Sequence, residues 1–390
     1  MTNLQEIASY DWLAATFQTI GVPGTMRLFS QVGFKLTLIG NPRKLSPPEM
    51  PLTLRPDAIV FNKGSGGGTA TDPYRFRLEA PLQACLQQHP LISFGHIDVI
   101  CGLNNLRKLF DFASGKRGNA FRIDIETCGE VLMMTRWESD PKNLTQTSLC
   151  RGYGRGFEEA CTTQGNLEVD STSHHRVISY SLGRLNILLQ HEVDACDCQC
   201  LEQDGKDNTS PTPQHQAWNA APARLPPSMV DSSDSSAMPL VVVDHGTRHS
   251  SACLVEIKSR DKKNARKDDI MVQMWLSGCH RLFLGRHLRG RFVSTDVYQE
   301  DITSDIGNWQ ADHENEISDF VRLLELIRQT VCEAASKAGS GRYALICARG
   351  RAEKQLELWR REGGQDMLRQ ETLSRVQVVP NIAGLDIKTL

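Results

Sequence analysis

The stretch LVEIKSR, from Leu254 to Arg260, places a glutamate and a lysine two residues apart inside an apolar run. Alternate side chains of a β-strand project to the same face, so we expect Glu256 and Lys258 side by side, with Val255 and Ile257 packed behind them. A charge in apolar surroundings is costly unless it has a partner. The stretch therefore predicts a core strand that carries polar chemistry on one face.

Length and composition indicate a globular protein. The chain has 390 residues, of which 40% are hydrophobic, and this length permits one large domain or two. With 44 basic and 46 acidic residues there is no overall cationic field, so a nucleic-acid partner would need a local basic patch. The N-terminal sequence lacks a basic start followed by an apolar segment, and no apolar run approaches the roughly 18 residues of a membrane span. We expect an intracellular protein without a membrane partner, with the nucleus slightly favoured over the cytoplasm.

The cysteines are scattered, as in a reduced protein. The cluster CDCQC contains Cys196, Cys198 and Cys200, but its alternating spacing is not the C-x-x-C of common zinc sites. Free thiols are therefore expected, with structural zinc as the alternative.

Breakers and composition divide the chain. Residues 1–75 contain little helical periodicity and several breakers, which predicts an irregular segment that wraps around a core. Its run GSGGGTATDP, residues 64–73, lacks the ending of a phosphate-binding P-loop and is interpreted as a flexible loop. Residues 76–350 form the expected catalytic domain, and the Ser- and Pro-rich residues 202–239 are a predicted disordered insertion. Residues 351–390 are expected to be a helical or irregular extension of the same domain.

Periodicity predicts strands and helices in alternation. FRIDIE and EVLMMTRWE alternate across a turn at Cys128 and Gly129, and RVISYSL and LNILLQHEVDACD do so across Gly183 and Arg184, so two β-hairpins are predicted. Further strands are expected in residues 240–245, 252–260, 280–286 and 342–349, and a long amphipathic helix in residues 316–337. The pattern predicts an α+β single domain of mixed β-sheets flanked by helices.

A second pair of charges precedes the insertion. In HEVDAC, Glu192 and Asp194 are again two residues apart in an apolar context. If this strand neighbours the strand of Glu256 and Lys258, three carboxylates and one ammonium converge, and a divalent cation would relieve their repulsion. Acidic residues and an E-x-K motif on adjacent strands are typical of a nuclease-like core that binds Mg²⁺ or Mn²⁺. Solvated charges at strand ends are the alternative.

Two predicted helices add candidates. GYGRGFEEAC opens a helix with Glu158 directly after Phe157, and DDIMVQMWLSG is a short helix that carries Gln273. Either residue could instead occupy an ordinary exposed helix position.

The ordered series G-x-x-F-E, E-V-D, E-I-K-S and Q-M-W-L-S-G-C-H-R-L-F-L-G resembles the DXO family of RNA 5′-end decapping nucleases, in a divergent fungal form. The resemblance extends from Leu54 to Val331. The family's motifs fall on Gly154, Phe157, Glu158, Glu192, Asp194, Glu256, Lys258, Gln273 and Gly285. The resemblance implies that Glu158, Glu192, Asp194, Glu256 and the backbone carbonyl of Ile257 bind one or two Mg²⁺ or Mn²⁺ ions. Lys258 and Gln273 would position the attacking water.

The resemblance also implies an activity. Members of the family remove incomplete, unusual or NAD-type caps from RNA 5′ ends, and many then degrade the RNA as 5′–3′ exonucleases. RNA 5′ ends are therefore the expected partner, and a 5′–3′ exoribonuclease is the expected protein partner.

One position departs from the family. In CGLNNLRKL, Leu103 stands where the family has an arginine that meets the substrate phosphates, and Arg107 or Lys108 are the candidate substitutes. Two alternatives to a decapping enzyme stay open: a DNA nuclease with the same acid and E-x-K chemistry, and a catalytically weakened descendant that binds RNA or a partner.

Overall fold

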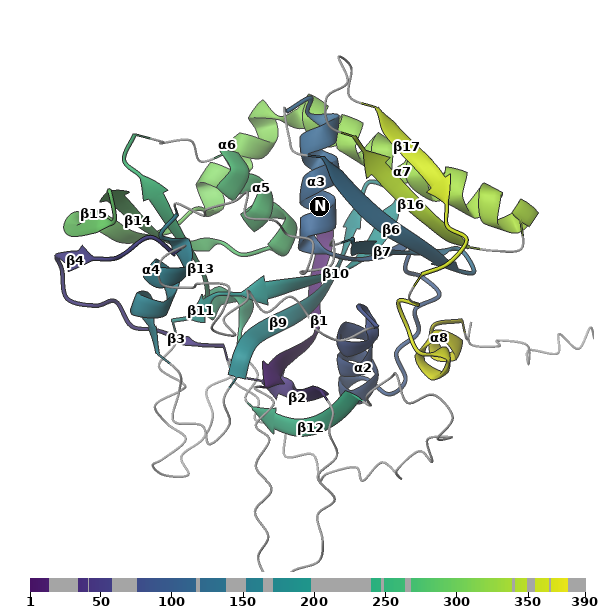
Figure 1. Cartoon of the computed structure of the whole chain (residues 1–390), viewed down its shortest axis with the longest axis horizontal. Coiled ribbons are helices and arrows are strands. Elements are labelled where there is room, and N and C mark those ends of the chain that lie inside the picture. The colour runs from purple at the N-terminus through teal and green to yellow at the C-terminus, as the bar shows by residue number, and fades with distance from the viewer. Residues whose placement is uncertain are drawn as a thin grey trace, which may run out of the picture.

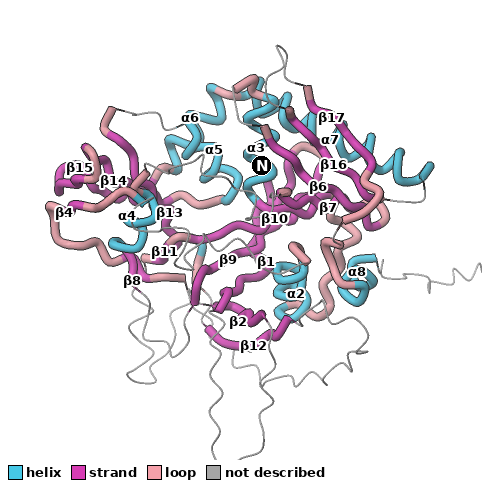
Figure 2. Tube along the Cα trace, in the orientation of Figure 1, coloured by secondary structure: helices cyan, strands magenta, loops and turns pink. Residues whose placement is uncertain are grey.

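Two mixed β-sheets flanked by helices make up the described part of the chain (Figure 1, Figure 2). In the computed structural model, the described residues are 1–13, 34–40, 42–57, 76–116, 120–137, 152–163, 171–197, 240–246, 249–263, 268–338, 341–348, 355–364 and 366–377. This architecture confirms the α+β fold class that the sequence predicts. The glycine run 64–73, the insertion 202–239, and Cys198 and Cys200 lie outside the described residues.

The larger sheet contains ten of the described strands, in the order β12-β2-β1-β9-β10-β5-β7-β6-β16-β17. Its strands are β1 (Thr2–Leu13), β2 (Phe34–Gly40), β5 (Val99–Gly102), β6 (Phe121–Cys128), β7 (Val131–Arg136), β9 (Ser171–Leu182), β10 (Leu185–Val193), β12 (Leu240–Gly246), β16 (Arg342–Cys347) and β17 (Leu356–Arg360). Both predicted hairpins are confirmed as β6–β7 and β9–β10. Gly129 and Gly183 turn these hairpins at φ of 62° and 60°, a conformation that glycine adopts without strain.

The smaller sheet contains seven described strands, in the order β4-β15-β14-β13-β11-β3-β8. Its strands are β3 (Lys44–Leu45), β4 (Leu52–Thr53), β8 (Thr162–Thr163), β11 (Ala195–Cys196), β13 (Leu254–Asp261), β14 (Arg281–Leu288) and β15 (Arg291–Asp301). Figure 1 shows this sheet at the left, whereas the larger sheet runs from β12 at the bottom to β17 at the upper right.

Helices cover the sheets and close the main core. They are α2 (Glu79–Gln88), α3 (Leu103–Ala113), α4 (Gly154–Cys161), α5 (Asp268–Ser277), α6 (Thr303–Asp312), α7 (Glu314–Ala338) and α8 (Gln370–Gln377). The predicted long helix is α7. The rings of Phe110, Trp275, Trp309 and Phe320 pack together where α3, α5, α6 and α7 meet. No helix in the described residues is long and apolar enough to cross a membrane.

The first residues of the chain correct one prediction. Residues 2–13 are not an irregular wrap, because β1 pairs with β2 on one side and with β9 on the other. Tyr10 and Trp12 are buried on one face, while Asp11 is buried on the opposite face and meets His174 at 2.6 Å. This distant partner allows a charged residue inside the sheet, and no local pattern reveals it. At the other end, residues 356–360 extend the sheet as β17, which a helical or irregular extension did not predict.

The two sheets meet at Asp194. Strand β10 of the larger sheet ends at Val193, and β11 of the smaller sheet begins at Ala195. Ala195 pairs with Val255 of β13, so the predicted adjacency of the E-x-D and E-x-K segments is confirmed. The fold thus gathers the acidic motifs at the junction of its sheets.

Candidate active site

Strand β13 presents Glu256 and Lys258 to the same side, as the opening stretch predicts. The Lys258 ammonium donates a hydrogen bond to Oε1 of Glu256. Glu256 is only 4% exposed, so its carboxylate depends on such partners. On the opposite face, Val255 and Ile257 are buried in a hydrophobic cluster that includes Phe157. The lysine is therefore the charge partner that allows this glutamate inside the core.

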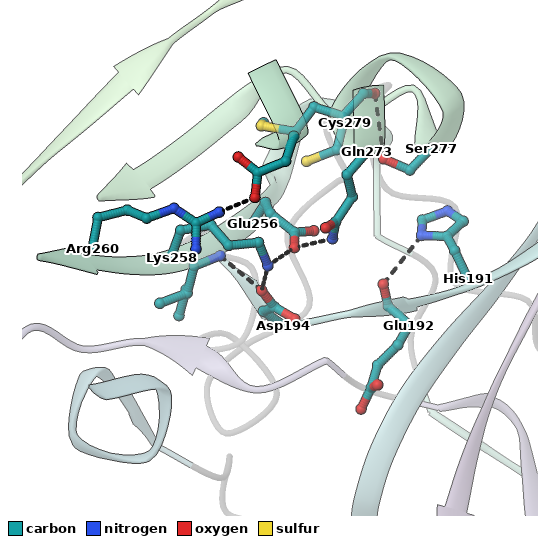
Figure 3. Close-up of polar contacts among 12 residues, drawn as sticks. His191, Glu192, Asp194, Glu256, Lys258, Arg260, Gln273, Ser277 and Cys279 are labelled. Atoms are coloured by element: carbon teal, nitrogen blue, oxygen red, sulfur yellow. Dashed lines mark hydrogen bonds and ion pairs between the residues drawn. The ribbon is translucent and has the colours of Figure 1, made fainter. Parts of the chain in front are cut away.

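Asp194 joins this pair from the sheet junction. Its Oδ2 accepts a hydrogen bond of 2.8 Å from the backbone N–H of Ile257 and lies 3.5 Å from Nζ of Lys258. Figure 3 shows the lysine ammonium between the two carboxylates of Asp194 and Glu256. Two acids from different strands thus share one cation.

Gln273 reaches the same carboxylate from α5, the helix that connects the parallel strands β13 and β14. Its Nε2 donates to Oε1 of Glu256 (Figure 3). The apolar residues Ile270 and Met274 on the same helix are buried and hold it against the core. The structure therefore brings together Asp194, Glu256, Lys258 and Gln273 of the predicted site.

Glu158 is presented by α4, which is anchored at two points. The ring of Phe157 is completely buried and stacks on Phe292, with a centroid separation of 4.5 Å. At the N-terminus of the helix, Asp57 accepts hydrogen bonds from the N–H groups of Arg155 at 3.1 Å and Gly156 at 3.0 Å. A carboxylate at this position satisfies otherwise free donors and complements the helix dipole. Asp57 was missed from the sequence because it acts on residues about a hundred positions away.

Glu192 does not lie beside Asp194 in the way that strand alternation predicts. The strand ends between them, and Figure 3 shows the carboxylate of Glu192 pointing away from Lys258 and Glu256. Within the described residues, no hydrogen bond joins Glu192 to the other acids. The backbone carbonyl of Glu192 instead faces Nδ1 of His191 at 3.2 Å.

The acidic residues repel one another. Burial and repulsion from Asp194 and Glu192 raise the pKa of Glu158 to about 8. Burial and then Asp194 raise the pKa of Glu256 to about 7, and the same causes raise that of Glu192 to about 7. The side chain of Glu192 is exposed, so we attribute the rise in its pKa mainly to repulsion from Asp194. Burial alone would lower the pKa of Lys258, but Asp194 and Glu256 outweigh it and raise that pKa.

These raised pKa values describe a site that is short of positive charge. Carboxylate oxygens are the donors that Mg²⁺ and Mn²⁺ prefer, so the residue types fit such an ion. In the described residues, however, no three His, Cys, Asp or Glu side chains are arranged as a ligand set. The charge that balances Asp194 and Glu256 comes here from Lys258. Ligation by the carbonyl of Ile257 stays a prediction.

Leu103, which stands where the DXO family has an arginine, is buried. Leu103 begins α3 and is 9% exposed in the main hydrophobic cluster. The candidate substitutes Arg107 and Lys108 lie half-buried further along α3. In the described part of the chain, no ion pair or hydrogen bond joins either of them to the acidic residues. Within the described residues, the structure therefore shows no contact that would make Arg107 or Lys108 part of the site.

Cys196 does not support the zinc alternative by itself. Its thiol is reduced and buried at the pairing of β11 with β13, and Cys253 lies close enough to influence its pKa, which burial raises to about 12. A thiol with a raised pKa is a poor metal ligand because the thiolate is the binding form. For the cluster, zinc and free thiols both stay predictions, because Cys198 and Cys200 lie outside the described residues.

The arrangement of the sheets is that of solved fungal Rai1 proteins. The chain is similar to Scheffersomyces stipitis Rai1 in complex with (3′-NADP)⁺ and calcium, with a TM-score of 0.57, 13% identity and 96% of each chain covered. It is also similar to Candida albicans Rai1 in complex with pU5 and Mn²⁺, with a TM-score of 0.56, 13% identity, and 96% of this chain and 94% of that chain covered. Schizosaccharomyces pombe Rai1 in complex with 3′-FADP matches with a TM-score of 0.52, 15% identity, and 92% and 94% coverage.

These similarities confirm, at the level of the fold, the resemblance to the DXO family that the motifs indicate. Residues 2–346 match the model of a family described as a domain of unknown function (DUF8563), and the chain belongs to that family. A comparison with curated protein sequences finds no match.

Proposed function

We propose that this protein is a divalent-metal-dependent hydrolase of RNA 5′ ends, which removes incomplete, unusual or NAD-type caps. The observation that carries the proposal is the meeting of Asp194, Glu256 and Lys258 at the junction of the two sheets. The fold adds support, because Rai1 proteins of the same fold bind a 5′-phosphorylated oligonucleotide or dinucleotides. Further degradation of the RNA body as a 5′–3′ exonuclease belongs to the same proposal.

Each residue has a role in this proposal. Glu158, Glu192, Asp194 and Glu256 would hold one or two Mg²⁺ or Mn²⁺ ions, which would supply Lewis-acid activation of the phosphoryl group and of water. Lys258, which here neutralises Asp194 and Glu256, would then offset charge that develops on the substrate phosphate. Gln273, already directed at Glu256, orients the attacking water.

The test is cap release from short RNAs that carry an NAD, triphosphate, methylated or monophosphate 5′ end. Wild-type protein is incubated with Mn²⁺, with Mg²⁺ and with a chelator, and a DNA duplex in the same series addresses the DNA-nuclease alternative. Glu256→Gln preserves shape but removes a ligand charge, so it should remain folded and lose turnover. Glu314→Gln, at an exposed position of α7, is the control and should retain it. No RNA 5′-end turnover by folded wild-type protein with either metal would reject the proposal.

One observation favours a second function. Because Leu103 is packed in the core where the family has an arginine, the protein could have become a catalytically weakened binder of RNA 5′ ends. Calorimetry with Ca²⁺ and a 5′-phosphorylated oligonucleotide would then detect binding, whereas Mn²⁺ would give no turnover. For either function we propose an intracellular location, with the nucleus favoured, and a 5′–3′ exoribonuclease as the protein partner.

A further inference from the structure

Among the described residues, three cations near the acidic site already have partners, and a fourth does not. Lys258 contacts Asp194 and Glu256, while Arg260 pairs with Asp269. Arg281 pairs with Asp197 at 2.8 Å. These cations therefore have partners that an incoming phosphate would have to displace.

Arg43 is the exception. It lies directly before β3, and its carbonyl accepts a hydrogen bond of 2.7 Å from the N–H of Cys196, two residues beyond Asp194. On the other side of β3, Leu45 pairs with Thr162, which follows α4 and whose hydroxyl donates to the carbonyl of Glu158 at 2.9 Å. Arg43 thus sits between the segment that carries Asp194 and the segment that carries Glu158.

The Arg43 side chain lies near Glu158. Leu45, two residues further on, is buried in the cluster that contains Phe157, the residue before Glu158 on α4. The guanidinium is close enough to Glu158 to lower the pKa of that carboxyl, although burial and the acids outweigh it. Arg43 is half-buried, and in the described part of the chain it has no ion pair and donates no side-chain hydrogen bond. Its donors are available beside the acidic site.

We infer that Arg43 binds the 5′-terminal phosphate of the RNA and supplies, from a different element, the contact that Leu103 cannot make. This inference rests on the proposed function. A guanidinium suits the role because its planar donors form paired, charge-assisted bonds with phosphate oxygens. Leu103 is buried and apolar, so this position of α3 provides no such bond to a phosphate.

The test is binding of fluorescent pentaribonucleotides that differ only in a 5′-phosphate or a 5′-hydroxyl, measured by anisotropy in Ca²⁺ so that binding is separated from turnover. Wild-type protein should prefer the phosphorylated RNA by about tenfold or more, the value of one charge-assisted contact. Arg43→Ala should abolish the preference while leaving affinity for the hydroxyl RNA unchanged. Arg43→Lys should keep part of it, because a lysine retains the charge but not the paired geometry.

Arg322→Ala is the matched control. It removes the same charge from an exposed arginine of α7 whose ion-pair partner is Asp319 and not an acid of the site, and it should retain the full preference. Thermal melting checks that each variant is folded, and Mn²⁺ titration checks that Arg43→Ala still binds metal. If Arg43→Ala does not fold, Arg43→Lys and Arg43→Gln decide the question by the same preference.

The outcomes separate the two proposals. A wild-type protein that prefers 5′-phosphate, with the preference unchanged in folded Arg43→Ala, overturns the role of Arg43 and leaves the proposed function standing. A wild-type protein that releases caps but shows no phosphate preference also overturns it. Absence of both RNA binding and turnover rejects the proposed function, and the role of Arg43 with it.

Discussion

The ring of Phe157 lies directly over Gly285 of β14. A Cβ added to this glycine would stand 2.7 Å from Cε1 of the phenylalanine and closer still to Cζ. The absence of a side chain at Gly285 therefore allows α4, the helix that carries Glu158, to pack closely on β14. Because Phe157 is also stacked on Phe292, the ring has little freedom to move away.

Gly285→Ala should lower the free energy of unfolding by about 1 to 3 kcal/mol, the usual cost of overpacking a core. It should also weaken metal-dependent turnover, since α4 must shift. Urea unfolding and a Mn²⁺ titration of activity measure the two effects. Gly307→Ala on α6 is the control, because its Cβ meets no atom within 4 Å and alanine favours a helix. Equal stability of wild type and Gly285→Ala would contradict the close packing of Phe157 on Gly285.

Asp57→Ala should cost about 1 kcal/mol of stability, because the N–H groups of Arg155 and Gly156 lose their acceptor. Loss of the anchor should also raise the Mn²⁺ concentration needed for half-maximal turnover. Asp57→Asn should recover only part of the stability, since its single side-chain oxygen can accept from only one of the two N–H groups. Glu159→Ala is the control. It removes an exposed carboxylate that pairs with Arg155 on the same helix, and it should alter stability by less than about 0.5 kcal/mol. A metal dependence that Asp57→Ala leaves unchanged would show that the cap does not position Glu158.

Acid should destabilise the protein through His175. Burial, followed by His174 and His191, lowers the pKa of His175 to about 3, and its ring nitrogens contact Ser173 and Gln190. The unfolded value is about 6.5, so this stability is present above pH 6.5 and is lost as the pH falls toward 3.

Between pH 6 and 4, this group should contribute a slope of about 1.4 kcal/mol per pH unit. Urea unfolding at several pH values should show a smaller slope for His175→Gln than for wild type. His280→Gln, at an exposed position, should behave as wild type does. The same slope in all three proteins would exclude a buried neutral His175.

Leu103→Arg separates two consequences of the departure from the family. An arginine that reached substrate would increase activity, but burial of Leu103 in the main cluster makes destabilisation the expected result, by about 3 kcal/mol or more. Asn104→Arg, at the exposed neighbouring position, should leave stability unchanged. Thermal melting and turnover on 5′-end-labelled RNA are measured together. A stable Leu103→Arg protein with higher turnover would show that the side chain reaches the site after all.

Local patterns in the sequence determined the motifs and much of the secondary structure. The hairpins at Gly129 and Gly183 and the shared face of Glu256 and Lys258 follow from turn chemistry and strand alternation, which involve only near neighbours. The order of the motifs then indicated the DXO-like fold. These features need no knowledge of the tertiary structure.

Contacts between distant residues were decided by the tertiary structure alone. The sequence could not place β1 inside the sheet, because Asp11 is stabilised there by a residue that is distant in the sequence, His174. It could not show that a strand ends before Asp194, that Leu103 is buried, or that Asp57 holds a helix 98 positions away. Each of these depends on which elements pack together, and no local pattern carries that information.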